Sequence, residues 1–369
     1  MSKAKVCHIS SVHPDNDVRI LHKQCVSLAE AGYDTSLILT NVQERNHKGV
    51  KIISVSSKKG SRIMRMTETV NKVLKEALKV DADIYHFHDP ELLRIASKLK
   101  GQNKKVIYDV HEDLPRQLMS KKYINSGLKK ILSFLVEKYE DKTSSKLDYI
   151  ITSTPHIRDR FKKVHPNTVD INNFPIKDEL FSDYEYENKT EDHICYVGGL
   201  TTQRGIKEIV IAIGLSKASL LLAGKFTESG LRENIESLNG WKKVKELGYV
   251  DRKEVKDVYK QSKIGLVTLH PIENYLDSLA VKMFEYMASG IPVIASNFPL
   301  WKDIVEGNNA GICVDPLSPE NIAEAVDYLL NNPKVAKQMG ENGKRLVMEK
   351  YNWAVEKQKL LDIYKKLSN

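Results

Sequence analysis

Short β-rich runs alternate with helical patterns along the whole chain, and the alternation starts afresh after residue 192. In the first half, strands are predicted at residues 5–11, 35–40, 83–87, 105–110 and 148–153. In the second half, they are predicted at residues 193–197, 218–224, 263–269, 291–296 and 311–314. Because these runs are largely apolar and helical patterns separate them, they predict parallel sheets covered on both faces. We therefore expect an α/β protein with two doubly wound, Rossmann-like domains.

The boundary between the two domains is predicted from a change in composition. Residues 172–192 accumulate polar and acidic side chains without periodicity, as a linker does. We expect an N-terminal domain over 1–180, a C-terminal domain over 181–352, and a helix over 353–369 that crosses back to the first domain. Two such domains face each other across a cleft, and ligands bind at the carboxyl ends of their strands.

The composition is that of an ordinary folded protein: 41% of the 369 residues are hydrophobic and 28% are charged. No stretch of 18 apolar residues and no apolar leader core is present in the sequence, so we expect a cytoplasmic protein. The four cysteines are far apart and form no CxxC pair, which predicts buried thiols rather than a disulfide framework or a zinc site.

The positive charge is concentrated in the first half. Of the formal net charge of +9, residues 1–185 carry +8. The basic residues gather at 58–65 and at 121–130, where KKYINSGLKK runs into the apolar ILSFLVEKY. Such a segment either rests on an anionic membrane surface or forms a solvated helix face. Nucleic-acid binding is not expected, because neither a recognisable module nor interleaved aromatic residues accompany the basic ones.

The most informative stretch is PIENYLDSLAVKMFEYMASGIPVIA, residues 271–295. A helix of about eleven residues is predicted there, with Ser278 as N-cap and Gly290 as stop. Ser278, Lys282 and Glu285 then share one face. Free amides, a lysine one turn in and a carboxylate two turns in suit a sugar nucleotide diphosphate. A solvated Lys282–Glu285 pair is the alternative interpretation.

A second candidate is the loop GGLTTQRG, residues 198–205, between a predicted strand and a helix. Its open backbone can approach a phosphate, and Arg204 can donate paired hydrogen bonds to it. A plain connecting turn is the alternative, because the loop matches neither GxGxxG nor the P-loop pattern.

Histidines follow two strands of the first domain. His111, in YDVHEDLP, is placed either to contact a sugar or to serve a structural role. His86 and His88, in YHFHDP, share one strand face, but no third ligand stands at a usable spacing, so no metal site is predicted. Asp81 and Asp83 match a D-x-D pattern by letter only and precede a strand, which indicates a turn.

Taken together, several of these segments resemble retaining glycosyltransferases of family four, which have the GT-B fold, of the bacterial surface-polysaccharide type. The segments that carry the resemblance are HPDNDVRI, YHFHDPELL, YDVHEDLPRQ, YVGGLTTQRGI and SLAVKMFEYMASGIPVIAS, followed by AGICVDPLSPENIAEAV. They extend over nearly the whole chain and stand in the family's order.

By this resemblance, Glu285 binds the donor's ribose, and Asp277 stands where the family has a glutamate that contacts the donor sugar. That departure leaves Glu273 or a backbone group as a substitute for this contact. Ser278 and Leu279 supply amides to the diphosphate, and Lys282 lies beside them.

The resemblance also assigns residues that stabilise the leaving phosphate. Arg204 matches one basic residue, and Gly199, next to Gly198 in the donor loop, stands where a second, often an arginine, is found. The remaining implied positions are His111 near the donor sugar, Asn16 and Asp17 in the loop that replaces a glycine-rich one, and Val250 and Arg252 in the turn that holds the base.

The implied activity is hexosyl or N-acetylhexosaminyl transfer from a nucleotide diphosphate sugar, by default a UDP-sugar, to a saccharide or lipid-linked acceptor, with retention. The resemblance implies no cofactor and no obligatory metal. It also implies surface-polysaccharide synthesis at the cytoplasmic face of the plasma membrane. A noncatalytic nucleotide-binding partner subunit and a GT-B sugar-nucleotide epimerase are the alternatives. No carboxylate is clearly placed as a nucleophile, so our hypothesis is a front-face path in which the leaving phosphate accepts the acceptor's proton.

Overall fold

The computed structural model describes residues 3–57, 65–119, 125–180 and 191–368. Some predicted segments lie outside these ranges: residues 58–64 of the first basic segment, Lys121 and Lys122 of the second, and the linker residues 181–190. The chain divides into two compact units: unit 1 comprises residues 1–173 and 354–369, and unit 2 comprises residues 174–353. The division at 173 precedes the expected boundary at 180, because Phe174 already packs in unit 2, with its ring centroid 4.8 Å from that of Phe284.

Unit 1 is built on an eight-stranded sheet in the order β3-β4-β2-β1-β5-β6-β7-β8. All neighbouring strands are parallel except β3 and β4. The strands are β1 (Lys5–Ile9), β2 (Asp34–Thr40), β3 (Arg45–His47), β4 (Val50–Val55), β5 (Ile84–Phe87), β6 (Lys105–Val110), β7 (Tyr149–Thr152) and β8 (Thr168–Asp170). The predicted doubly wound sheet of the first half is therefore confirmed.

The central strands of unit 1 separate apolar from polar side chains by simple alternation. Cys7 and Ile9 of β1 and Tyr85 and Phe87 of β5 belong to the hydrophobic core on one face. The side chains that alternate with them point to the opposite face. They are His8 in β1, His86 in β5 with His88 just after it, and Asp109 in the neighbouring β6. These polar residues are fully buried, which sets that face apart from an ordinary core.

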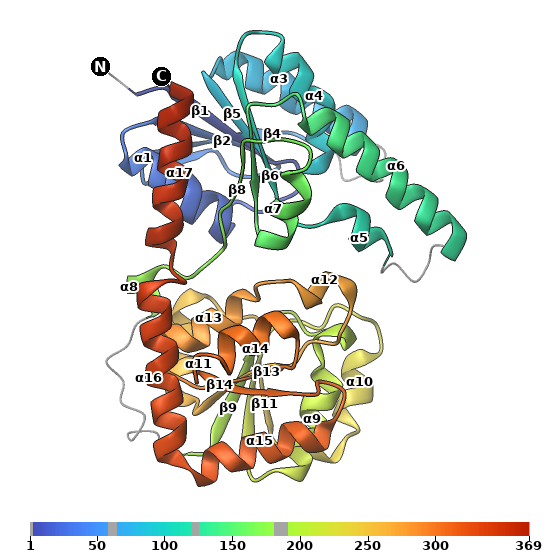
Figure 1. Cartoon of the computed structure of the whole chain (residues 1–369), viewed down its shortest axis with the longest axis vertical. Coiled ribbons are helices and arrows are strands. Elements are labelled where there is room, and N and C mark those ends of the chain that lie inside the picture. Colours follow the sequence, from blue (N-terminus) through green and yellow to red (C-terminus); the bar gives the residue numbers. More distant parts are fainter. Residues whose placement is uncertain (1–2, 58–64, 120–124, 181–190, 369) are drawn as a thin grey trace. The chain divides into compact units, whose positions relative to one another are not determined.

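Helices cover both faces of the unit 1 sheet (Figure 1). They comprise the π-helical η1 (Val18–Cys25) and η2 (Arg65–Thr69), the 3₁₀ turn η3 (Pro90–Leu92), α1 (Val26–Glu30), α3 (Val70–Val80), α4 (Leu93–Lys100), α5 (Leu114–Met119), α6 (Ser126–Ser144), α7 (Pro155–Phe161) and α17 (Trp353–Ser368). Beyond Trp353, α17 belongs to unit 1. Its Tyr364 is buried against the polar face of the sheet.

Unit 2 has a six-stranded, fully parallel sheet in the order β11-β10-β9-β12-β13-β14. Its strands are β9 (His193–Val197), β10 (Ser219–Ala223), β11 (Val244–Gly248), β12 (Ile264–Val267), β13 (Val293–Ser296) and β14 (Gly311–Val314). Its helices are α8 (Lys177–Leu180), η5 (Thr202–Arg204), α9 (Ile206–Leu215), α10 (Leu231–Glu236), η6 (Asn239–Lys243), α11 (Arg252–Gln261), α12 (Glu273–Leu276), α13 (Val281–Ala288), α14 (Pro299–Val305), α15 (Pro319–Asn331) and α16 (Pro333–Glu349). Separate hydrophobic clusters line the two faces of this sheet.

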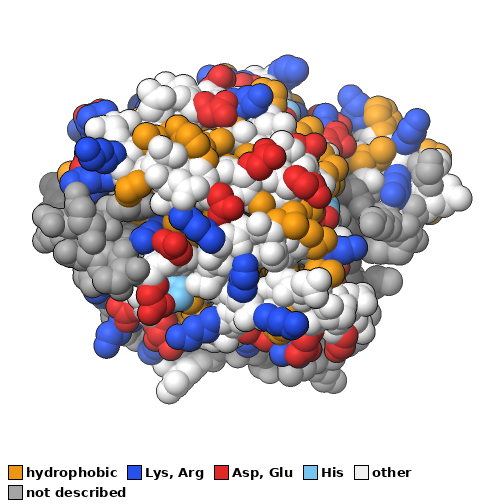
Figure 2. Space-filling model, turned by 90° about the horizontal axis from the view of Figure 1, so that it is seen from below, with side chains coloured by type: hydrophobic (Ala, Val, Ile, Leu, Met, Phe, Trp, Pro, Cys, Tyr) orange, Lys and Arg blue, Asp and Glu red, His pale blue; other side chains and the backbone are white. Residues whose placement is uncertain are grey.

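Two surface properties bear on function. Among the described residues, no helix has both the length and the apolar content needed to cross a membrane. On the face shown in Figure 2, acidic and basic side chains are intermingled. The thiols are placed as expected, since Cys7, Cys25 and Cys195 are buried, Cys313 is half-buried, and none of these four described cysteines forms a disulfide.

Candidate functional site

In unit 2, the loop after β9 brings the backbone unusually close to two cations. Gly198 has φ +137°, which side-chain-bearing residues rarely adopt. A Cβ at this position would lie 2.9 Å from Lys282 Nζ and 3.3 Å from Arg204 Nη1. Two positively charged groups thus converge on an open stretch of backbone at the carboxyl end of β9. The sequence analysis placed Gly198, Arg204 and Lys282 at the donor's diphosphate, and the structure brings these three residues together.

Lys282 lies on α13 with its ammonium nitrogen buried. Nζ sits 3.5 Å from the centroid of the Tyr196 ring, an arrangement in which the ring face attracts a cation. Among the described residues, Nζ has no hydrogen-bond partner. Burial, followed by the charge of Arg204, holds the pKa of Lys282 well below its usual value. An anion bound here would accept a hydrogen bond from the nitrogen and favour its charged form.

Arg204 is held in place by tyrosines. Burial works against its charge, but contacts with Tyr196 and Tyr275 keep the pKa of Arg204 above its usual value. Its Nη1 would lie 3.5 Å from a Cβ at Gly199, so the Arg204 guanidinium already lies against the position where the family often has an arginine.

The helix predicted to begin after Ser278 begins later. α12 ends at Leu276, and α13 runs over Val281–Ala288, with Ala280 as N-cap and no side-chain cap. Ser278 is therefore not an N-cap, and that prediction is wrong. Its amide and its hydroxyl both donate to the carbonyl of Tyr275, at 3.1 and 2.9 Å. The Ser278 amide is thus engaged by α12 in this structure, contrary to its expected exposure to a diphosphate.

The neighbouring predicted residues take different environments. Asp277 ends α12 and is exposed. Leu279 packs against the hydrophobic core of unit 2, and so does Val250, which stands between β11 and α11.

Glu285 and Arg252, which the sequence assigned to ribose and base contacts, are ion-paired with each other. Arg252 Nη1 donates to Glu285 Oε1 at 2.7 Å, and the hydroxyl of Tyr259 donates to Oε2 at 2.9 Å. Arg252 also donates to both oxygens of Glu179, at 2.9 and 3.1 Å. Each oxygen of Glu285 thus already accepts one hydrogen bond, and a ribose hydroxyl either joins these donors at a second lone pair or displaces one of them.

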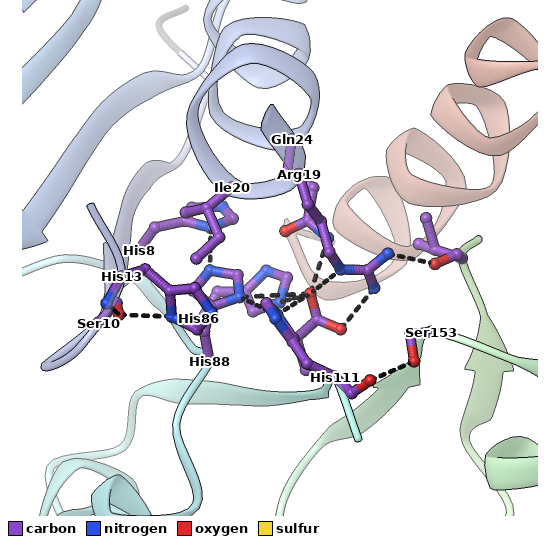
Figure 3. A network of polar contacts seen from close by, with 12 residues as sticks. His8, Ser10, His13, Arg19, Ile20, Gln24, His86, His88, His111 and Ser153 are labelled. Atoms are coloured by element: carbon purple, nitrogen blue, oxygen red, sulfur yellow. Dashed lines mark hydrogen bonds and ion pairs between the residues drawn. The ribbon is translucent and has the colours of Figure 1, made fainter. Parts of the chain in front are cut away.

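The polar face of unit 1 centres on the buried carboxylate of Asp109 in β6 (Figure 3). Arg19 donates to Oδ1 at 2.6 Å and to Oδ2 at 3.1 Å, and Gln24 donates to Oδ2 at 2.8 Å. Nitrogens of His88 and His111 lie 3.3 Å from Oδ2. Burial disfavours the charged carboxylate, but Arg19 and then His111 outweigh it and hold the pKa of Asp109 well below its usual value.

Four histidines and one tyrosine extend this network into a continuous chain. His111 Nε2 lies 3.1 Å from His88 Nδ1, and His88 Nε2 lies 3.0 Å from His8 Nδ1. The hydroxyl of Tyr364 lies 3.0 Å from His8 Nε2 and 2.8 Å from His86 Nδ1. Burial lowers the pKa of His88 to about 3 and lowers those of His8 and His86 well below the usual value. In a neutral imidazole one nitrogen donates and the other accepts, which lets such rings relay hydrogen bonds along the chain.

Two groups in this chain have metal-ligand composition: His8, His86 and His88, and His88, Asp109 and His111, with ligand atoms within 4.8 Å of one another. The third ligand that the sequence did not reveal is His8, which β1 places opposite His86. However, Oδ2 of Asp109 lies 3.1 Å from the Arg19 Nε, so a divalent cation there would meet a positive charge. The hydrogen-bond chain accounts for these contacts without a metal, except at His86 Nε2, which is buried without a partner.

Sequence reasoning missed a histidine–carboxylate pair at the same sheet edge. His13 Nδ1 lies 3.1 Å from Oδ1 of buried Asp89, and Asp89 Oδ2 accepts from the Ser10 hydroxyl and from the amide and hydroxyl of Ser11. The His13 ring is partly exposed, and its centroid lies 4.9 Å from that of His111. Burial opposes the charge of His13, but Asp89 holds its pKa above the usual value.

The predicted loop residues beside this pair are Asn16 and Asp17. Asn16 is exposed. Asp17 caps η1, because its Oδ1 accepts from the amide of Ile20 at 2.8 Å. The residues that line the carboxyl ends of β1, β5 and β6 are thus polar, preorganised and suited to binding hydroxyl-rich ligands.

Comparison with known proteins gives the class of this fold. Residues 18–172 match the family described as Glycosyltransferase Family 4, and residues 178–346 match Glycosyl transferases group 1. A sucrose-phosphate synthase from Thermosynechococcus elongatus superposes with a TM-score of 0.81 at 17% identity, over 99% of both chains. Anabaena HepE in complex with UDP-glucose superposes at 0.75 and 12% identity, over 98% of this chain and 100% of that one. The protein has the GT-B fold.

Relatives in sequence agree with this class. An uncharacterized glycosyltransferase, MJ1607, of Methanocaldococcus jannaschii is 29% identical over 47% of this chain and 45% of its own. A second, MJ1069, is 24% identical over 79% and 77%. The chain spans about half the length of the first relatives that it matches. Residues 18–172 thus match one glycosyltransferase family and residues 178–346 another, and these two relatives in sequence also carry glycosyltransferase names.

Proposed function

We propose that the protein transfers a hexosyl or N-acetylhexosaminyl group from a nucleotide diphosphate sugar to a saccharide or lipid-linked acceptor, with retention at the anomeric carbon, in cell-surface polysaccharide synthesis. A UDP-sugar is the proposed donor, and the solved neighbours that carry UDP or UDP-glucose support it. The observation that carries the proposal is the pair of cations, Lys282 and Arg204, that converge on Gly198 with the Lys282 amine buried and without a hydrogen-bond partner among the described residues.

The chemistry requires stabilisation of negative charge on the departing diphosphate. Lys282 and Arg204 are fixed by Tyr196 and Tyr275 before the donor arrives, so little reorganisation is needed when charge develops. No cofactor or obligatory metal is part of the proposal. We retain the front-face path, in which the bond from the anomeric carbon to phosphate breaks, the bond to the acceptor oxygen forms on the same face, and the leaving phosphate takes the acceptor's proton.

The remaining predicted residues act around this centre. Glu285 binds the ribose by accepting a hydrogen bond from a ribose hydroxyl. His111 lies near the donor sugar, and Asp277, exposed at the end of α12, contacts its hydroxyls. We place the acceptor on the polar edge of unit 1, where His13 and His111 stand.

A second candidate is a noncatalytic nucleotide-binding partner subunit. Asp277 and Gly199 favour it, because they stand where the family has a glutamate and often an arginine. Turnover distinguishes the transferase from the partner subunit. A transferase releases free nucleoside diphosphate in the presence of its acceptor, whereas the subunit binds the nucleotide and releases it unchanged. An epimerase converts the sugar nucleotide without any acceptor.

Thermal stabilisation by nucleoside diphosphates and sugar nucleotides tests the donor site. A ligand at 100 times its dissociation constant adds about 2.7 kcal/mol of stability. We expect one nucleotide to stabilise the wild type selectively, with the shift reduced in Lys282→Gln and Arg204→Gln. The matched control is Lys302→Gln, an exposed lysine on α14 of the same unit. Absence of any shift with the whole panel would refute the donor site.

A further inference from the structure

The outer face of α6 exposes an apolar stripe that the fold leaves uncovered by any described residue. Helix α6 lies at the edge of unit 1, beside α4 and α5 (Figure 1). Five of its large apolar side chains are between 47% and 59% exposed: Leu128, Ile131, Phe134, Leu135 and Tyr139. Their spacing of three and four residues places them on one side of the helix. A contiguous apolar patch of this kind marks an interaction surface rather than a solvated helix face.

The ion pairs of α6 fix which side faces outward. Glu140 is buried and pairs with Arg160 of α7, and Asp141 lies 3.6 Å from the same guanidinium. Glu137 pairs with Arg116 of α5 at 2.8 Å. All three acidic residues of the helix are thus tied to unit 1. Rotating the helix about its axis to bury the apolar stripe would break these ion pairs, and the acidic side chains would gain no better partners in exchange.

Two of the basic residues of α6, Lys138 and Lys142, lie on the side opposite these acids and are exposed. On a helical projection, Lys138 and Lys142 fall among the apolar side chains, and Lys138 Nζ lies 5.7 Å from the centroid of the Phe134 ring. The outer face therefore combines apolar side chains and lysines, while the acids face inward. This charge separation is complementary to a negatively charged, apolar partner.

We propose that the outer face of α6, residues 128–142, docks unit 1 onto an anionic lipid surface, with the helix lying in the plane of the interface. Its apolar side chains enter the boundary between headgroups and acyl chains, and the lysines reach back to the phosphates along their methylene stems. A second copy of the chain fits this face less well, because a twofold contact would bring Lys138 and Lys142 of each copy toward their counterparts. The proposal does not depend on the proposed donor site, and it gives a lipid-linked acceptor a place of approach.

Binding of the full chain to lipid vesicles without nucleotide tests the surface. The probes are vesicles of phosphatidylcholine alone and of phosphatidylcholine with phosphatidylglycerol, separated by flotation. We expect binding to the anionic vesicles that weakens as salt is raised. Lys138→Gln combined with Lys142→Gln is expected to lower the partition coefficient about 30-fold, since each lysine contributes about fivefold. Ile131→Gln combined with Phe134→Gln is expected to abolish binding.

Matched control variants come from unit 2. Lys242→Gln with Lys245→Gln removes two exposed lysines, and Leu317→Gln with Tyr328→Gln removes two exposed apolar side chains, so both are expected to bind as the wild type does. Thermal melting of every variant without nucleotide shows that the chain is folded, and hydrogen exchange of the α6 amides shows that α6 is retained. Binding that is equal in the α6 variants and the controls would overturn the proposal. So would a wild-type dimer in sedimentation velocity that the Ile131 and Phe134 substitutions dissociate.

Discussion

The buried pair of Arg19 and Asp109 predicts a large loss of stability in Arg19→Met. The two side chains are 5% and 0% exposed and are joined by two hydrogen bonds of 2.6 and 3.1 Å. Removing one partner of a buried pair costs about 3–5 kcal/mol, because the other charge stays buried without its charged partner. We therefore expect the free energy of opening of the central unit 1 sheet to fall by that amount at neutral pH.

Hydrogen exchange of the β6 amides measures this effect without interference from unit 2. The expected loss corresponds to exchange about 150- to 5000-fold faster in Arg19→Met. The control is Arg158→Met, which removes a more exposed ion pair with Asp170, 2.7 Å long, in the same unit. That pair is expected to contribute about 1 kcal/mol or less. If the two variants lose equal stability, the central role of the Asp109 network is refuted.

The pH dependence of stability in the wild type and in Arg19→Met provides an independent test, because the direction of the change is predicted. In the wild type, the pKa of Asp109 is held well below its unfolded value of about 3.9, so the pair's contribution is present above that pH and is lost as pH falls through the folded pKa. In Arg19→Met, burial without the guanidinium raises that pKa. The folded variant then takes up a proton more readily than the unfolded chain, and its deficit shrinks between pH 7 and pH 5. A deficit that grows over this range would contradict the reasoning.

Two further predictions concern the edges of the sheets. Gly198→Ala is expected to lower the nucleotide affinity at least tenfold, measured as reduced thermal stabilisation, because its Cβ would lie 2.9 Å from Lys282 Nζ and its φ of +137° strains any side chain. The control is Gly230→Ala, whose Cβ would meet nothing within 4 Å. Unchanged nucleotide affinity in Gly198→Ala would count against the close approach. For the His13–Asp89 pair, the folded pKa of His13 is raised, so its stabilisation is full below the unfolded pKa of about 6.5 and is lost as pH rises through the folded pKa. We expect Asp89→Asn to remove that pH-dependent component in thermal melts taken from pH 5 to pH 9, and an unchanged pH profile would show that another group carries it.

The fold was predictable because its signals are local. The β6 strand at 105–110, β9 at 193–197 and β14 at 311–314 have the predicted bounds, since apolar runs flanked by helical patterns mark buried parallel strands. The two-domain doubly wound architecture followed from their order and is confirmed. The start of α13 was misjudged, because Ser278 is a common N-cap residue, and only the tertiary environment shows that Tyr275 holds it.

Part of the site was predictable from the family resemblance. Gly198 and Arg204 share one loop, and the resemblance placed both of them and the distant Lys282 at the donor. The contribution of His8 was hidden, because a histidine inside an apolar run looks like a strand residue and its partner His88 is 80 positions away. The Arg252–Glu285 pair likewise joins residues 33 positions apart, and a sequence pattern for binding does not show that two binding residues also bind each other.

The hydroxyl of Tyr364 has a consequence for the order in which unit 1 folds during synthesis. It closes the hydrogen-bond chain between His8 of β1 and His86 of β5, so these two strands stay without this partner until α17, which follows them in the chain, has been made. Domains generally fold as units during synthesis, in N-terminal order. Here unit 1 cannot bury its polar face until all of unit 2, residues 174–353, has been synthesised. The imidazoles of β1 and β5 therefore remain hydrated through most of translation, which delays the last step of unit 1 folding until its neighbour is complete.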